Sequence, residues 1–135
     1  MCVRNRTSTV LLVEDEVLIR MFIAELLAEA GFEVIEASDA ATALKCLELG
    51  AEDVQAVFTD VDMPPGMSGL ELAQQVHQRW PEIGVVVTSA HHRPNADAIA
   101  GCGAFIPKPY EPEVVVEALQ RSLGNAEVSR HSLRV

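Results

Sequence analysis

The sequence lacks several features that would place it in other protein classes. No run of about 18 apolar residues occurs among its 135 residues, so we expect no membrane-spanning helix. The first ten residues, MCVRNRTSTV, contain no apolar segment like that of a secretory signal. The three cysteines, Cys2, Cys46 and Cys102, are scattered and odd in number, which argues against a disulfide framework or a zinc site. We therefore expect a cytoplasmic protein.

Basic residues are also scarce. The chain has 10 lysines and arginines against 20 aspartates and glutamates, for a net charge of −10. Residues 9–123 hold six of the basic residues and nineteen of the acidic ones. Such a surface repels phosphate backbones, so we expect no binding of nucleic acid. It suits a magnesium ion or a basic partner surface instead.

Short apolar segments alternate with helical patterns along the chain. This alternation predicts an α/β fold with a central parallel sheet, whose ligand site lies at the carboxyl ends of the strands. Glycines mark three expected helix ends, and Ser38-Asp39 and Ser68-Gly69 mark two expected helix starts. The predicted strands cover 9–14, 32–36, 54–59, 83–88 and 104–107, the predicted helices cover 16–30, 39–49, 69–79, 95–101 and 111–123, and the glycines are Gly31, Gly50 and Gly124.

A chain of this length, 49% hydrophobic, predicts one domain with a substantial core. We expect this domain over residues 9–124. Residues 1–8 and 125–135 are expected to be solvated tails. We therefore expect no DNA-binding domain elsewhere in this chain.

Polar residues gather where the predicted strands end. Glu14 ends the first strand and Asp15 follows it, and Asp60-Val61-Asp62 follows the third. Thr88 ends the fourth, and Lys108, one of only two lysines, follows the fifth. Clustered carboxylates repel one another, and Mg²⁺ relieves that repulsion through oxygen ligands and water. An aspartate can also attack phosphorus and form an aspartyl phosphate.

The ordered set LLVEDE, FTDVDMP, VVVTSA and IPKPY resembles the response-regulator receiver domain of two-component signalling, from about Val10 to Leu123. The resemblance implies a flavodoxin-like, doubly wound (βα)5 fold with a five-stranded parallel sheet in the order 2-1-3-4-5. It implies that Asp60 is the phosphoacceptor. Glu14 and Asp15, with Asp60 and the backbone carbonyl of Asp62, would hold Mg²⁺.

The same resemblance implies roles for residues on the last two strands. Thr88 would be the switch hydroxyl, and Lys108 would pair with the phosphoryl group and precede a cis peptide at Pro109. Phe105 stands where many receivers carry a tyrosine, so its rotation would lack a hydrogen-bonded form. The loop after Asp60 is one residue longer than is common. The short pattern over 91–103 argues against the usual dimerisation through the fourth helix, fifth strand and fifth helix, and the oligomeric state stays open between a monomer and a weak dimer.

The implied function is that of a phosphoacceptor response regulator. It would take a phosphoryl group from a sensor histidine kinase or a histidine phosphotransfer protein and signal to a downstream protein. It would catalyse only its own phosphorylation and dephosphorylation. The first helix, apolar nearly all round, would either be deeply buried or dock such a partner.

Other interpretations of the same residues stay open at this point. Asp60 and Asp62 are also common turn residues, and Glu14-Asp15 also suits a helix N-terminus. A degenerate receiver would act as an unphosphorylated binding module. A phosphatase of the haloacid-dehalogenase type also uses Asp-x-Asp at a strand end, although that family places it on the first strand.

Overall fold

The computed structural model describes residues 8–62, 66–89 and 103–134, with the backbone alone for 124–134. Strands and helices alternate from β1 to β4, as the sequence predicts, and β5 is followed by one further helix. The helix expected over 95–101 lies outside them. The elements are β1 (Thr9–Val13), α1 (Val17–Glu29), β2 (Glu33–Ala37), α2 (Ala40–Gly50), the short 3-10 helix η2 (Ala51–Asp53), β3 (Ala56–Asp60), α3 (Gly69–Arg79), β4 (Gly84–Ser89), β5 (Ala104–Pro107) and α5 (Pro112–Arg134).

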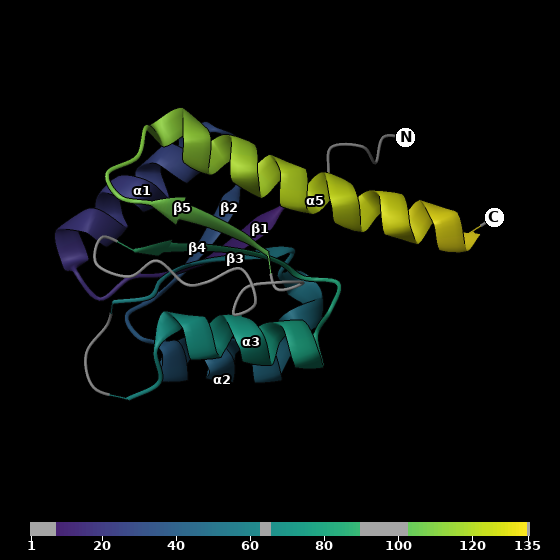
Figure 1. Ribbon diagram of the computed structural model, residues 1–135, viewed down its shortest axis with the longest axis horizontal. Coiled ribbons are helices and arrows are strands. Elements are labelled where there is room, and N and C mark those ends of the chain that lie inside the picture. The colour runs from purple at the N-terminus through teal and green to yellow at the C-terminus, as the bar shows by residue number, and fades with distance from the viewer. Residues whose placement is uncertain (1–7, 63–65, 90–102, 135) are drawn as a thin grey trace.

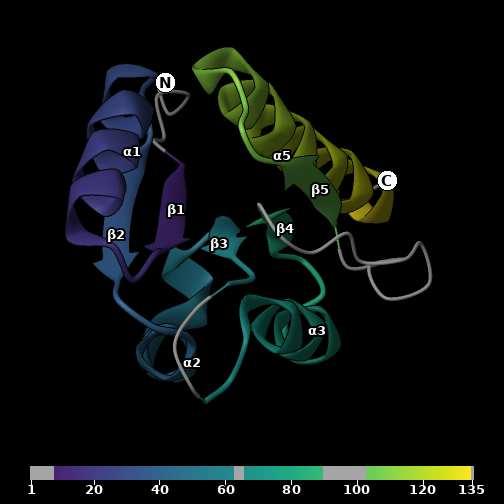
Figure 2. The ribbon, with the colours of Figure 1, turned by 60° about the vertical axis from the view of Figure 1, so that its left-hand side comes forward.

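The five strands form one parallel sheet in the order β2-β1-β3-β4-β5. This confirms the predicted α/β class and the strand order. Helices α1 and α5 cover one face of the sheet, and α2 and α3 cover the other (Figures 1 and 2). The chain reverses its direction of winding at β1, so β1 and β3 meet where a doubly wound sheet places its ligand site.

The core consists of two apolar clusters, one on each face of the sheet. Along β1, Val10 and Leu12 pack in the cluster with α1 and α5, whereas Leu11 and Val13 pack in the cluster with α2 and α3. Successive strand side chains point to opposite faces, so a strand covered on both sides must be apolar throughout. All five residues of β1 are buried, which explains the continuous apolar run in the sequence.

Local signals set several of the helix boundaries. The Asp39 side chain accepts a hydrogen bond from the Thr42 backbone N–H at 2.7 Å and so caps α2. Ser68 and Glu71 exchange reciprocal backbone–side-chain bonds at the start of α3. Gly31, with φ of +102°, follows the end of α1 in the left-handed region that favours glycine. These three predicted boundaries are confirmed.

The predicted end of the last helix is wrong. The sequence analysis placed a helix stop at Gly124, but α5 continues to Arg134 and extends past the sheet (Figure 1). A glycine costs a helix interior about 1 kcal/mol relative to alanine, which weakens a helix without ending it. No proline follows Gly124 to break the helix. The predicted division into a domain over residues 9–124 and tails over 1–8 and 125–135 remains a prediction.

Candidate functional site

The structure brings the predicted strand-end residues together at one edge of the sheet. Asp60 is the last residue of β3 and is 4% exposed, and Glu14, directly after β1, is 5% exposed. Thr88 on β4 is the register partner of Asp60. Lys108 directly follows β5. Four elements distant in sequence therefore supply one cluster of two carboxylates, a hydroxyl and an ammonium group.

Asp60 is held by contacts to both of its carboxylate oxygens. Its Oδ2 lies 2.7 Å from Nζ of Lys108, and its Oδ1 accepts a hydrogen bond of 2.9 Å from the backbone N–H of Asp62. Burial alone would lower the pKa of Lys108, but the hydrogen bond and charge of Asp60, with Glu14, raise it above its ordinary value. Lys108 therefore stays protonated and positively charged beside Asp60.

The backbone around Asp60 is packed closely from two sides. The N–H of Val61 donates to the carbonyl oxygen of Thr88 at 2.9 Å, which continues the β3–β4 pairing past Asp60. On the other side α3 begins at Gly69, and a Cβ there would overlap the carbonyl oxygen of Asp60. Glycine at this position lets α3 start against the strand end. The carboxylate of Asp60 thus projects from a rigid support.

Glu14 is electrostatically coupled to this cluster. Burial raises its pKa to about 7, and the charges of Asp60 and Asp15 act in the same direction. The backbone N–H of Glu16, which donates to Oε2 of Glu14 at 3.2 Å, opposes that rise, as does the charge of Lys108. Three carboxyl groups, those of Glu14, Asp60 and Asp15, thus interact at this edge with one another and with the ammonium group of Lys108.

Two hydroxyl groups at the end of β4 behave differently. Within the described residues, the Oγ1 of Thr88 is the one buried side-chain N or O atom without a hydrogen-bond partner. A buried unsatisfied hydroxyl is costly, so such a group often has a functional reason. The neighbouring Ser89, in contrast, donates from its Oγ to Oδ2 of Asp62 at 2.7 Å. The Ser89 hydroxyl therefore orients the side chain of Asp62.

The donor atoms present suit magnesium better than a metal that is bound by several protein side chains alone. Among residues 8–62, 66–89 and 103–134, no three or more His, Cys, Asp and Glu side chains converge so as to hold a metal ion by themselves. Magnesium needs fewer protein ligands, since it is usually bound through one or two carboxylates and keeps several waters. The carboxyl groups gathered around Glu14 and Asp60 fit such an ion.

The remaining predicted site residue is less directly involved. Phe105 on β5 is partly buried and packs against the core cluster on the side of α2 and α3. It lies one strand away from Asp60, because its register partner is Val87 on β4. The Lys108–Pro109 peptide is cis, as expected. The weak helical pattern over 91–103 lies almost entirely outside the described residues.

The sequence analysis missed one residue that contacts the acidic loop, which is the segment 14–16 between β1 and α1. Arg20, in the first turn of α1, donates from Nη1 to the backbone carbonyl oxygen of Glu14 at 2.8 Å. Its Nε is 3.1 Å from Oε1 of Glu36 on β2. A signal was present, since a cation in the first turn of a helix opposes the helix dipole. Its target could not be read from the sequence.

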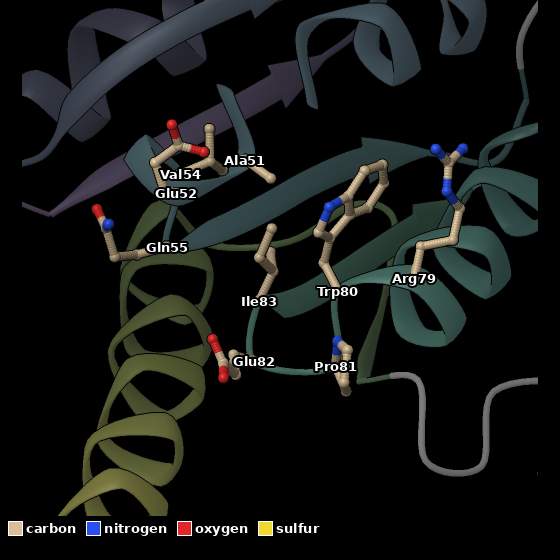
Figure 3. A pocket seen from close by; sticks show the side chains of 9 residues that line it. All are labelled: Ala51, Glu52, Val54, Gln55, Arg79, Trp80, Pro81, Glu82 and Ile83. Carbon is tan, nitrogen blue, oxygen red and sulfur yellow. The ribbon is translucent and has the colours of Figure 1, made fainter. Parts of the chain in front are cut away.

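A separate hollow of about 360 Å³ lies at the opposite, amino-terminal edge of the sheet (Figure 3). The only tryptophan of the chain, Trp80, lines it, with the guanidinium of Arg79 4.5 Å from the ring centre. Arg79 is also paired with Glu48 at 3.0 Å. None of the predicted site residues contributes to this hollow. Trp80 is therefore a spectroscopic probe remote from Asp60.

Comparison with known proteins decides the family. Residues 10–120 match the model of the response regulator receiver domain. The chain belongs to the receiver domain family. The strand order, the acidic residues after β1 and β3 and the lysine after β5 all agree with this membership, which leaves the haloacid-dehalogenase interpretation without support.

Three known proteins illustrate the relationship. The chain is 32% identical to the chemotaxis protein CheY of Bacillus subtilis, over 84% of this chain and 96% of CheY. It is 29% identical to the putative two-component response regulator ARR21 of Arabidopsis thaliana, over 92% of this chain but 20% of that protein. The crystal structure of TrrA from Thermotoga maritima, a complex with Mg²⁺ and BeF, is 26% identical with a TM-score of 0.78, covering 87% of this chain and 100% of TrrA.

Membership identifies the chain as the receiver domain of a two-component response regulator. Receiver domains are signalling modules that interact with histidine kinases and downstream targets, and they are not generally enzymes. The chain spans only a fifth to a quarter of some multidomain relatives, such as ARR21 and the regulator NtrC of Escherichia coli. Of the helices that the structure describes, none is long and apolar enough to cross a membrane.

Proposed function

We propose that this receiver accepts a phosphoryl group from a phosphohistidine onto the side chain of Asp60. One carboxylate oxygen of Asp60 attacks the phosphorus atom, the P–N bond to histidine breaks, and the histidine leaves with its bonding electron pair and takes up a proton. The observation that carries the proposal is the pairing of Asp60 Oδ2 with Lys108 Nζ at 2.7 Å, on a buried strand end beside Glu14. Phosphoryl transfer needs such positioning and charge neutralisation above all.

The other site residues have distinct roles in this proposal. Glu14, Asp15, Asp60 and the carbonyl oxygen of Asp62 bind Mg²⁺, which neutralises charge on the phosphoryl oxygens when bound. Lys108 pairs with a phosphoryl oxygen. The Thr88 hydroxyl, without a partner in this structure, donates to another phosphoryl oxygen and so acquires its hydrogen bond.

The response to phosphorylation would spread from Thr88. Phe105 lies on β5 next to β4, where it can reorient when the Thr88 side chain moves. Movement at these two residues changes the surface that a downstream protein contacts. The chain then acts through protein contacts and does not turn over a substrate.

The phosphoryl donor in this proposal is a sensor histidine kinase or a histidine phosphotransfer protein. The exposed face of α1 supports such a partner, because Leu18 is 79% exposed and Phe22 is 59% exposed in the half of the helix nearer to Asp15. Only Ile23 and Leu27 of α1 are buried. Of the two interpretations of this apolar helix, the docking surface is therefore favoured over deep burial.

The direct test is intact mass after incubation with acetyl phosphate, with and without Mg²⁺. We expect the wild type to gain one phosphoryl group only with Mg²⁺. Asp60→Asn should gain none. Asp62→Asn is the matched control, since it makes the same chemical change two residues away and leaves the backbone carbonyl in place, so it should still gain one group.

Failure would point to the alternative of an unphosphorylated binding module. If the wild type gains no group from acetyl phosphate or from a phosphorylated histidine protein, and binds no Mg²⁺ by calorimetry, the proposed chemistry is wrong. Equal uptake by Asp60→Asn would show that another residue is the acceptor.

A further inference from the structure

The side chain of Arg20 joins three elements around the acidic loop. It begins on α1, its Nη1 donates to the carbonyl oxygen of Glu14 at 2.8 Å, and its Nε is 3.1 Å from Oε1 of Glu36 on β2. The Arg20 side chain is only 18% exposed, so the guanidinium is largely enclosed by these contacts. A planar guanidinium with two donors engaged in different directions fixes the distance between its acceptors.

The carbonyl group that Arg20 binds lies just beyond the end of the β1–β2 pairing. Val13 and Ala37 are the last register partners of those strands, and the N–H of Glu14 donates to the carbonyl oxygen of Ala37 at 3.1 Å. Arg20 then binds the carbonyl oxygen of Glu14 itself. The Glu14 backbone is therefore held at both of its polar groups, and the carbonyl group that Arg20 binds belongs to the Glu14–Asp15 peptide.

The place of Arg20 on α1 is electrostatically unfavourable by itself. A positive charge in the first turn of a helix opposes the helix dipole and so destabilises the helix. Arg20 is also one of only six basic residues in the stretch 9–123. A residue that breaks a local rule usually has a reason in tertiary structure, and functional sites are where such exceptions gather.

We propose that Arg20 is a positioning residue for magnesium binding, which it supports by holding the Glu14–Asp15 peptide in place. Glu36 orients Arg20 in turn. The inference rests on the proposed function, in which Glu14 and Asp15 are magnesium ligands. Arg20 itself touches neither the metal nor the phosphoryl group in this scheme.

The direction in which Mg²⁺ affinity changes when Arg20 is removed distinguishes a positioning role from charge repulsion alone. Arg20 is a cation near a cation-binding site, so its removal should strengthen Mg²⁺ binding if Coulomb repulsion were its only influence. Removal of a positioning residue weakens binding, because the loop loses its support. Loss of a residue that hydrogen-bonds to a metal ligand typically lowers the affinity for the metal by about 10- to 100-fold. We expect Arg20→Ala to raise the Kd for Mg²⁺ about 10-fold.

The test measures Mg²⁺ binding to the whole chain by calorimetry, and phosphoryl uptake from acetyl phosphate as a function of Mg²⁺ concentration. Arg20→Ala should need about 10-fold more Mg²⁺ for half-maximal uptake, with a maximal rate close to that of the wild type. Arg20→Lys, which keeps one charged donor, should lie in between. Glu36→Gln keeps an oxygen acceptor for Arg20 and should stay near the wild type.

Arg79→Ala is the matched control. Arg79 also forms an ion pair between two elements, with its Nη1 3.0 Å from Oε2 of Glu48, but at the far edge of the sheet. Its removal should leave the Mg²⁺ affinity unchanged. Urea unfolding followed by circular dichroism shows whether each variant is folded, and Arg20→Lys tests the inference even if Arg20→Ala does not fold.

The outcomes are distinct. If the wild type binds Mg²⁺ and accepts a phosphoryl group, but Arg20→Ala or Arg20→Lys binds Mg²⁺ as tightly as Arg79→Ala or more tightly, the inference is overturned and the proposed function stands. If the wild type neither binds Mg²⁺ nor gains a phosphoryl group, the proposed function fails and the inference falls with it. If Mg²⁺ binding is weaker in the Arg20 variants but not in Arg79→Ala, both the inference and the proposed function are supported.

Discussion

The ammonium group of Lys108 and the carboxylate of Asp60 lie 2.7 Å apart, although 48 residues separate them in the chain. The contact exists because β3, β4 and β5 are adjacent and parallel, so their carboxyl ends meet at one edge. Lys108 is held there by its own backbone N–H, which donates to the carbonyl oxygen of Ser89 at 3.0 Å. The pair therefore follows from the sheet topology.

Removal of the Lys108 charge should slow phosphoryl uptake. We expect Lys108→Ala to lower the initial rate with acetyl phosphate by about 10-fold or more, because the transferred group loses a preorganised positive charge. Intact mass against time measures this rate. The control is Lys45→Ala, which removes the other lysine of the chain, exposed on α2, and should leave the rate unchanged. A wild-type rate in Lys108→Ala would exclude this role.

Replacement of Thr88 should affect stability and the response to phosphorylation differently. Thr88→Val replaces a buried hydroxyl without a partner by a methyl group, so the free energy of unfolding should stay the same or rise by about 1 kcal/mol. Thr59→Val is the contrast. The Oγ1 of Thr59 donates to the carbonyl oxygen of Asp60 at 3.2 Å, and its loss should cost about 1 kcal/mol.

Urea unfolding followed by Trp80 fluorescence measures both changes. The phosphorylated form of Thr88→Val should also lack the change in hydrogen exchange along β4 and β5 that the phosphorylated wild type shows. An equal loss of stability in the two valine variants would mean that the Thr88 hydroxyl is already satisfied before phosphorylation.

The exposed face of α1 should matter for a protein donor and not for a small one. Leu18→Ser with Phe22→Ser should slow phosphoryl transfer from a phosphorylated histidine phosphotransfer protein by about 10-fold, because large apolar side chains dominate interface energies. Uptake from acetyl phosphate should not change. Leu49→Ser, at an equally apolar position that is 88% exposed near the end of α2, is the control. A parallel loss with both donors would indicate damage to the fold.

The Asp39 cap of α2 makes a pH-dependent contribution to stability. Hydrogen bonds from the backbone and side chain of Thr42 hold the pKa of Asp39 below its ordinary value of 3.8. The cap is therefore fully stabilising above that value and is lost as the pH falls through the lower pKa of the folded state. Asp39→Ala should cost about 1 kcal/mol at pH 7 and less in acid.

Asp39→Asn separates the cap from its charge. Asparagine caps a helix about as well as aspartate but does not titrate in this range. Urea unfolding at pH 7 and at pH 3 should show near wild-type stability at pH 7 and a weaker pH dependence. If Asp39→Asn loses as much stability at pH 7 as Asp39→Ala, the charge and not the hydrogen bond is the important feature.

Most of the site could be predicted from the sequence because its residues occupy strand ends. Once strands and helices alternate, parallel pairing places every strand's carboxyl end on the same edge, so Glu14, Asp60, Thr88 and Lys108 had to approach one another. Helix starts at Asp39 and Ser68 are equally local, since each depends on hydrogen bonds within one turn. The end of α5 was mispredicted because a lone glycine is a weak stop signal.

The amino-acid order by itself determined the fold class, the strand order through its family resemblance, and the residues gathered at the site. These depend on patterns that repeat within a few residues. Tertiary structure alone decided that Arg20 binds the Glu14 carbonyl group, that Ser89 orients Asp62, and that most of the apolar α1 surface faces outward. Those facts depend on how whole elements pack, because a side chain's partner is set by the distance and angle between elements that no local pattern encodes.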